Sequence, residues 1–151
     1  MPIYLKSRFL GKVMTEGYKN YKEVEIETAS GLKLVVMLYA GAIKFLNIAK
    51  EGILTKKLDV ANNNIIKAQD IITELMTSLN FEAGEIAHNL YSLYIYMNRR
   101  LLEANIEKNP EIINEVIKLL NILKEAWDEL LKTQKDIIPS EKKANKVNIS
   151  G

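Results

Sequence analysis

The apolar positions of residues 86–106 cover more of a helix surface than one packed core requires. At about 100° per residue, six of them form a stripe with the spacing of a bundle interior: Leu90, Leu93, Tyr94, Met97, Leu101 and Ala104. Four others form a second strip beside the first: Tyr91, Ile95, Leu102 and Ile106. Because such a strip faces water unless something covers it, the pattern indicates a protein that binds another chain.

The same period, read along the whole chain, predicts four helical segments. Capping and turn residues set their limits: Ser30 and Gly52 for the first, Asp59 and Asn80 for the second, Gly84 for the start of the third, and Asn109-Pro110 for the start of the fourth. Short connections between long helices favour antiparallel neighbours. We therefore expect an all-α fold, an antiparallel up-down four-helix bundle.

The two ends of the chain are predicted to lie outside this bundle. Residues 1–17 are expected to form a flexible extension, and a short N-terminal capping segment follows at the start of a bundle domain spanning 18–135. Pro139 is expected to end helical structure. The tail, residues 136–151, has too few apolar side chains to offset the entropy of ordering it, so we expect it to be disordered.

The fourth segment repeats the apolar surplus of the third. Its apolar positions span an arc of about 220° and include Leu119 and Ile122 beyond the core stripe. The first segment is apolar over most of its circumference, whereas the second has the narrow stripe of an ordinary bundle member. The alternative is that the bundle and its N-terminal segment cover these strips themselves.

Composition and charge narrow the possible functions. The 151 residues, 48% of them hydrophobic, suffice for one domain, and the absence of cysteine favours a reducing cytosol. The longest charge-free apolar run, Leu34 to Ile43, is about half of the roughly 20 residues that a bilayer requires, so we expect no membrane insertion. The chain ends carry a net positive charge, and the body between them is mildly acidic, which argues against nucleic-acid binding.

Residues with catalytic or metal-binding chemistry are few. The glycines form neither a dinucleotide fingerprint nor a phosphate loop. Glu85 and His88 match the Glu-x-x-His spacing of di-iron bundles, but such a site needs a second copy, and His88 is the only histidine. Its helical position, opposite the core stripe, predicts a surface residue. We therefore expect no enzyme, metal or cofactor.

Short motifs in the chain resemble the flagellar secretion chaperone FliS family, in the same order from about Tyr18 to Leu130. The matching residues are Tyr18-Lys19-Asn20-Tyr21, Glu27-Thr28-Ala29-Ser30, Met37-Leu38-Tyr39, Gly41-Ala42-Ile43, Lys67-Ala68-Gln69-Asp70-Ile71-Ile72, Tyr94, Tyr96-Met97, Arg99-Arg100-Leu101 and Glu103-Ala104-Asn105. Two positions depart from the family pattern: Gly31 stands where Pro is common, and Ala40 where an acidic residue is common. The family's amino terminus is usually short, so residues 1–13 are an extension, or Met14 is the initiator.

The resemblance implies a cytoplasmic chaperone without catalysis. It would bind the carboxy-terminal segment of flagellin one-to-one, prevent premature polymerisation, and keep the flagellin competent for the flagellar type III export apparatus. Combined with the apolar strips, it suggests these flagellin-binding residues: Tyr18, Tyr21, Tyr91, Tyr94, Ile95, Leu102, Ile106, Leu119 and Ile122. The competing interpretations are a self-associating structural bundle and, disfavoured by the single histidine, a metal-dependent bundle enzyme.

Overall fold

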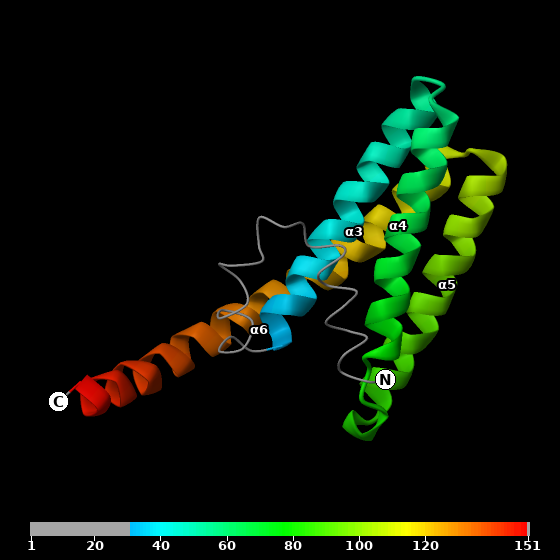
Figure 1. Cartoon of the computed structure of the whole chain (residues 1–151). Coiled ribbons are helices and arrows are strands. Elements are labelled where there is room, and N and C mark those ends of the chain that lie inside the picture. The colour runs from blue at the N-terminus through cyan, green and yellow to red at the C-terminus, as the bar shows by residue number, and fades with distance from the viewer. Residues whose placement is uncertain (1–30, 151) are drawn as a thin grey trace.

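The computed structural model describes the chain from residue 31 to 150, and its side chains from 31 to 133. Within this range the chain forms four α-helices and no strand: α3 (Gly31–Leu54), α4 (Leu58–Thr77), α5 (Glu85–Glu107) and α6 (Pro110–Ser150), with a 3-10 turn, η1 (Phe81–Ala83), before α5 (Figure 1). The predicted all-α four-helix bundle is confirmed. The N-terminal extension, the capping segment, Tyr18 and Tyr21 lie outside the described residues.

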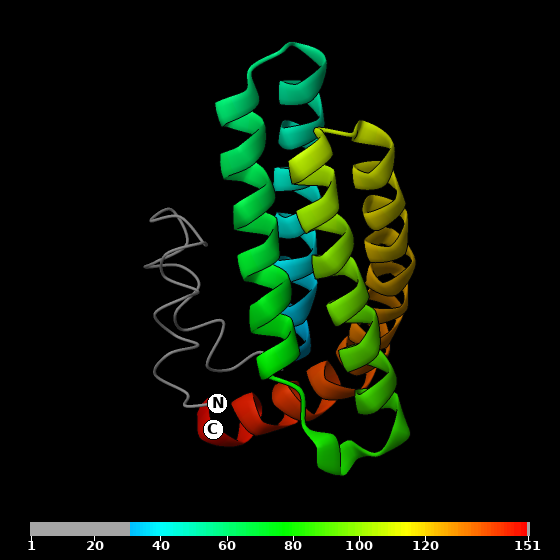
Figure 2. The same cartoon turned by 90° about the vertical axis from the view of Figure 1, so that its right-hand side faces the viewer.

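The helices are arranged so that α5 has a neighbour on each side. Figure 2 shows α5 between α4 and α6, with α3 behind them. α3 packs against both α4 and α6, and α4 packs against α5. α6 is inclined to the others and continues past the end of the bundle (Figure 1). This layout exposes the outward face of α5 and leaves the second half of α6 with few neighbours.

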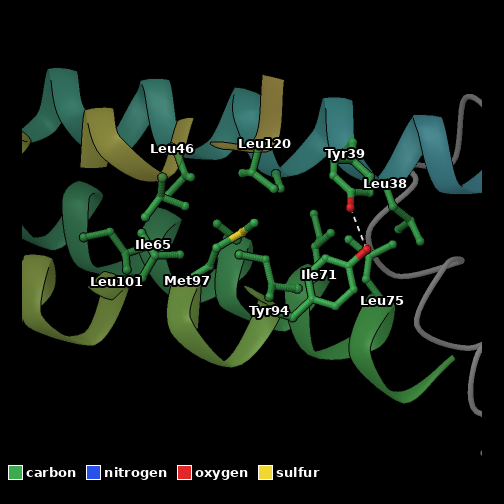
Figure 3. Packing of buried hydrophobic residues seen from close by; sticks show 14 of the residues in the cluster. Leu38, Tyr39, Leu46, Ile65, Ile71, Leu75, Tyr94, Met97, Leu101 and Leu120 are labelled. Atoms are coloured by element: carbon green, nitrogen blue, oxygen red, sulfur yellow. Dashed lines mark hydrogen bonds between the residues drawn. The ribbon is translucent and has the colours of Figure 1, made fainter. Parts of the chain in front are cut away.

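The core forms where the apolar stripes of the four helices meet. The stripe predicted for α5 is buried at Leu90, Tyr94, Met97, Leu101 and Ala104, and Leu93 packs partly buried against it. Small side chains let the helices approach closely. A Cβ atom on Gly52 would come within 3.0 Å of the Ala61 backbone nitrogen, so α3 and α4 make backbone contact there. Figure 3 shows the interdigitated side chains around Met97.

One polar pair lies within this apolar core. The Tyr39 and Tyr94 hydroxyls are 2.5 Å apart, and their hydrogen bond joins α3 to α5 (Figure 3). The Tyr39 ring also contacts Trp127 of α6, with 6.5 Å between ring centroids. Burial raises the pKa of both tyrosine hydroxyls, so both are protonated at neutral pH. The pair therefore connects three helices without burying a charge.

Several predicted helix limits agree with the structure, and one cap is wrong. Asn109 caps α6 as expected: its side-chain oxygen accepts a hydrogen bond from the Glu111 backbone N–H at 2.9 Å. Asp59 is not the cap of α4, which begins one residue earlier, at Leu58. Asp59 instead lies in the first turn of α4, where its negative charge interacts favourably with the helix dipole.

The second helix is also shorter than the sequence suggests. α4 ends at Thr77 rather than near Asn80. The Asn80 side chain accepts a hydrogen bond from the Glu82 backbone N–H at 3.0 Å and so caps η1, an element the apolar period does not predict. Gly84, with a φ of 97°, then forms the expected turn into α5.

The fourth helix runs further than expected. Helical structure was predicted to end at Pro139, but α6 continues to Ser150. A proline removes one backbone donor and disfavours a helix locally, whereas Glu141, Lys142, Lys143 and Ala144 are good helix formers, and here they continue it. Disorder of the tail stays a prediction, since the side chains after Thr133 are outside the described set.

Among the described helices, α3 alone has the length and apolar content to cross a membrane. The charge-free run considered above covers only part of its 24 residues. Seven of its residues are buried against the rest of the bundle: Leu34, Leu38, Tyr39, Ala42, Leu46, Ala49 and Gly52. α3 therefore contributes one apolar side of the bundle core.

Candidate protein-binding surfaces

The second apolar strip of α5 faces outward, as its period predicts. Leu101 is fully buried, while the next residue, Leu102, has 55% of its surface exposed and Ile106 has 75%. Ile95 is also exposed, and Tyr91 is half-buried. We call these four residues the α5 strip. Their exposure leaves apolar area in water that a partner could cover.

Tyr94 does not belong to this surface. It was included among the flagellin-binding candidates, yet only 1% of it is exposed, and its hydroxyl bonds to Tyr39 inside the core. Its helical position in the core stripe predicted this burial, whereas the family resemblance suggested a binding role. Tyr94 is therefore a core residue and not part of the exposed α5 strip.

α4 extends the α5 strip on one side. Asn105 on α5 donates a hydrogen bond to the Asn62 side chain at 2.9 Å, which fixes the row of α4 residues that borders α5. Leu58 and Ile66 lie one turn to either side of Asn62 in that row, and both are exposed. We call the α5 strip together with these two residues the α4–α5 face. The apolar period did not predict that Leu58 and Ile66 belong to this surface, because the apolar stripe of α4 is narrow.

Polar bonds join α4 and α5 along the boundary that crosses this face. The Gln69 side chain donates to the Asn98 backbone carbonyl at 3.3 Å, and the Asn98 side chain donates to the Thr73 hydroxyl at 3.1 Å. With the pair between Asn105 and Asn62, these bonds follow the boundary of the two helices over several turns. They fix the spacing between the helices, so the apolar residues on either side of the boundary keep their relative positions.

An aromatic cluster lies at the end of the face near η1. Phe81 is 4.9 Å from the His88 ring and 5.5 Å from the Tyr91 ring, measured between centroids. His88 is exposed, as predicted. It contributes to this cluster. Among the residues that the structure describes, no group of three His, Cys, Asp or Glu side chains could hold a metal ion.

The opposite edge of α5 is polar and joins α6. Glu115 of α6 accepts hydrogen bonds from the Tyr96 hydroxyl at 2.5 Å and from the Arg100 Nε at 2.7 Å, and Arg100 also pairs with Glu103. The hydrogen bond from Tyr96, reinforced by Arg100, lowers the pKa of Glu115. This network keeps Glu115 ionised and attaches the first half of α6 to α5.

Leu119 and Ile122 lie beyond this network, on α6. Leu119 is one turn after Glu115, and Ile122, 64% exposed, is nearly one further turn along the helix. Both were predicted, with the residues of the α5 strip, to bind flagellin. The structure separates them, because the α5 strip borders α4, whereas the polar network of Tyr96, Arg100 and Glu115 lies between α5 and α6. The described candidates therefore form two patches rather than one.

Comparisons with known proteins agree with the motifs. A statistical model of the family described as "Flagellar protein FliS" matches residues 14–134. The chain is 33% identical to the flagellar secretion chaperone FliS of Bacillus subtilis over 78% of its own length and 88% of the relative. It is 36% identical to the Vibrio cholerae protein of that name, over 73% and 85% of the two chains. For the Salmonella typhimurium protein the identity is 38%, over 76% and 89%.

Proposed function

This chain belongs to the FliS family of flagellar secretion chaperones, and we propose that it binds the carboxy-terminal segment of flagellin in the cytosol, one-to-one. Covering that segment would prevent premature polymerisation and keep flagellin competent for the flagellar type III export apparatus. The role requires binding and release, and no catalysis.

The observation that carries this proposal is the α4–α5 face. Leu102 and Ile106 are held in water by a rigid helix pair whose boundary is fixed by side-chain hydrogen bonds. An exposed apolar face on two adjacent helices suits an amphipathic helix with apolar residues at positions i, i+3, i+4 and i+7. Such a helix would cover Leu58 and Ile66 on one side and the α5 strip on the other.

A segment that is disordered when free suits this surface energetically. It can wrap a long apolar face, and its ordering on binding costs free energy, on the order of 2–5 kcal/mol, which moderates the affinity. Moderate affinity lets the complex form in the cytosol and dissociate at the export apparatus. A rigid client of equal contact area would bind more tightly and release more slowly.

Titration calorimetry with the flagellin carboxy-terminal segment tests the proposal. Leu102→Asp and Ile95→Asp should each weaken binding at least about tenfold, because each places a charge in the covered apolar surface. Ile48→Asp is the matched control, since Ile48 on α3 is 37% exposed against 38% for Ile95. Unchanged affinity in both α5 variants, with all three proteins folded by circular dichroism, would contradict the proposal.

Light scattering separates this function from self-association. The exposed α5 strip could also bind a second copy of the chain. A monomer that forms a one-to-one complex with flagellin supports the chaperone. A dimer that persists on dilution and does not respond to flagellin supports the structural bundle instead.

A further inference from the structure

The second half of α6 forms a surface distinct from the proposed flagellin site. The first half of the helix is embedded in the core through Ile112, Ile113, Val116 and Leu120. After Leu120, no side chain up to Thr133 is fully buried. Leu123 and Trp127 pack partly against the core and hold this part of the helix to the bundle. The rest of its circumference is unpartnered among the described residues.

This surface combines an apolar strip with a hollow. Leu119, Ile122, Ala126 and Leu130 recur at three- and four-residue spacing on the side of α6 that continues from Glu115. Ile122 and Leu130 are 64% and 51% exposed. Ile122 and Ala126 line a shallow hollow together with Glu125, Asp128, Glu129 and Lys132.

The charges around the hollow are mainly negative. Asp128 is paired with Lys124 at 3.0 Å. Glu125 and Glu129, four residues apart, form no ion pair within the described part of the chain. Like charges at this spacing repel each other along a helix, and a cation placed between them would relieve that repulsion. Lys132 supplies only one positive charge to the same border.

We propose that residues 119–133 of α6 dock a basic amphipathic helix, separately from the client on the α4–α5 face. Its apolar side chains would cover Ile122, Ala126 and Leu130, and its lysines or arginines would lie against Glu125 and Glu129. The polar network of Tyr96, Arg100 and Glu115 separates the two surfaces. The chaperone can therefore hold a client and a second partner at once.

Trp127 provides a direct readout, because it is the only tryptophan and lies on this half of α6. The probes are two synthetic amphipathic peptides with the same leucine positions, one bordered by lysine and the other by glutamate. Titrated into the full chain, the lysine peptide should change the Trp127 emission saturably, and its affinity should fall as salt increases. The glutamate peptide should bind at least about tenfold more weakly.

Variants locate the binding. Glu125→Gln with Glu129→Gln should weaken the lysine peptide by about threefold to tenfold and remove most of the salt dependence, without altering the fold. Ile122→Asp should weaken it at least about tenfold. Leu102→Asp, on the other surface, should leave it unchanged.

Three results would overturn the proposal. They are equal binding of both peptides, no saturable binding of the lysine peptide, and a loss of binding in Leu102→Asp in place of Ile122→Asp. Self-association of the chain that Ile122→Asp abolishes would assign the surface to a second copy instead. None of these results depends on flagellin, so the test is independent of the proposed chaperone function.

Discussion

Leu101 and Leu102 are adjacent in sequence, and the same substitution, Leu→Ala, made at each in turn compares the core with the binding surface. Leu→Ala removes about three carbon groups, worth on the order of 2.4 kcal/mol when fully buried. Leu101 is fully buried, so the cavity left behind adds to this loss, and we expect Leu101→Ala to lower the free energy of unfolding by about 3–4 kcal/mol. Leu102 is 55% exposed, so the same change there should cost less than about 1 kcal/mol.

Urea denaturation followed by circular dichroism measures both values. Leu102→Ala should also weaken flagellin binding in calorimetry, although it barely changes stability. A cost above about 2 kcal/mol for Leu102→Ala, similar to that of Leu101→Ala, would show that the strip is covered in the free protein. The α4–α5 face would then not be available to a client.

Three further predictions concern the core, the helix contact and the N-terminal segment. Burial raises the pKa of the Tyr39 and Tyr94 hydroxyls, so the folded chain keeps protons that the unfolded chain releases above a pH of about 10. The free energy of unfolding should therefore fall as the pH rises above that value. In the double variant Tyr39→Phe, Tyr94→Phe, this fall should be less steep, by about 1.4 kcal/mol per pH unit for each tyrosine removed. Equal pH dependence of the two proteins in alkaline denaturation would contradict this. Gly52→Ala should lower the free energy of unfolding by about 1–3 kcal/mol in the same urea assay, because the Cβ atom of the new alanine would meet backbone atoms of α4. An unchanged urea midpoint would show that α3 and α4 can move apart to admit it. Replacing both Tyr18 and Tyr21 with Ala should change the free energy of flagellin binding by more than about 1 kcal/mol, whereas deleting residues 1–13 should have little effect. If calorimetry gives the double tyrosine variant the same affinity as the unmodified chain, the tyrosines have no role in binding.

The helical period predicted which side of each helix is buried, because that choice depends on the local spacing of apolar residues. The period alone, without the positions of the neighbouring helices, distinguished the buried stripe of α5 from the exposed residues Ile95, Leu102 and Ile106. Asn109 was recognised as a cap for the same reason, since capping is a local interaction.

The arrangement of the surfaces depends on contacts between helices, and the sequence pattern carries no such information. Leu58 and Ile66 join the α4–α5 face only because Asn62 pairs with Asn105 across the helix boundary. Leu119 and Ile122 appeared equivalent to the α5 strip, since an apolar arc on one helix does not indicate which neighbour borders it. α5 has α4 on one side and α6 on the other (Figure 2), and the network of Tyr96, Arg100 and Glu115 on its α6 side separates these two residues from the α5 strip.

Light scattering on the chain mixed with the flagellin of its own organism is the most direct test of the chaperone role. The account predicts a monomeric chain that forms a one-to-one complex with full-length flagellin. It also predicts that the complex is lost when the carboxy-terminal segment of flagellin is removed, and that Leu102→Asp weakens it at least about tenfold. Undiminished binding of flagellin that lacks this segment would contradict the central claim.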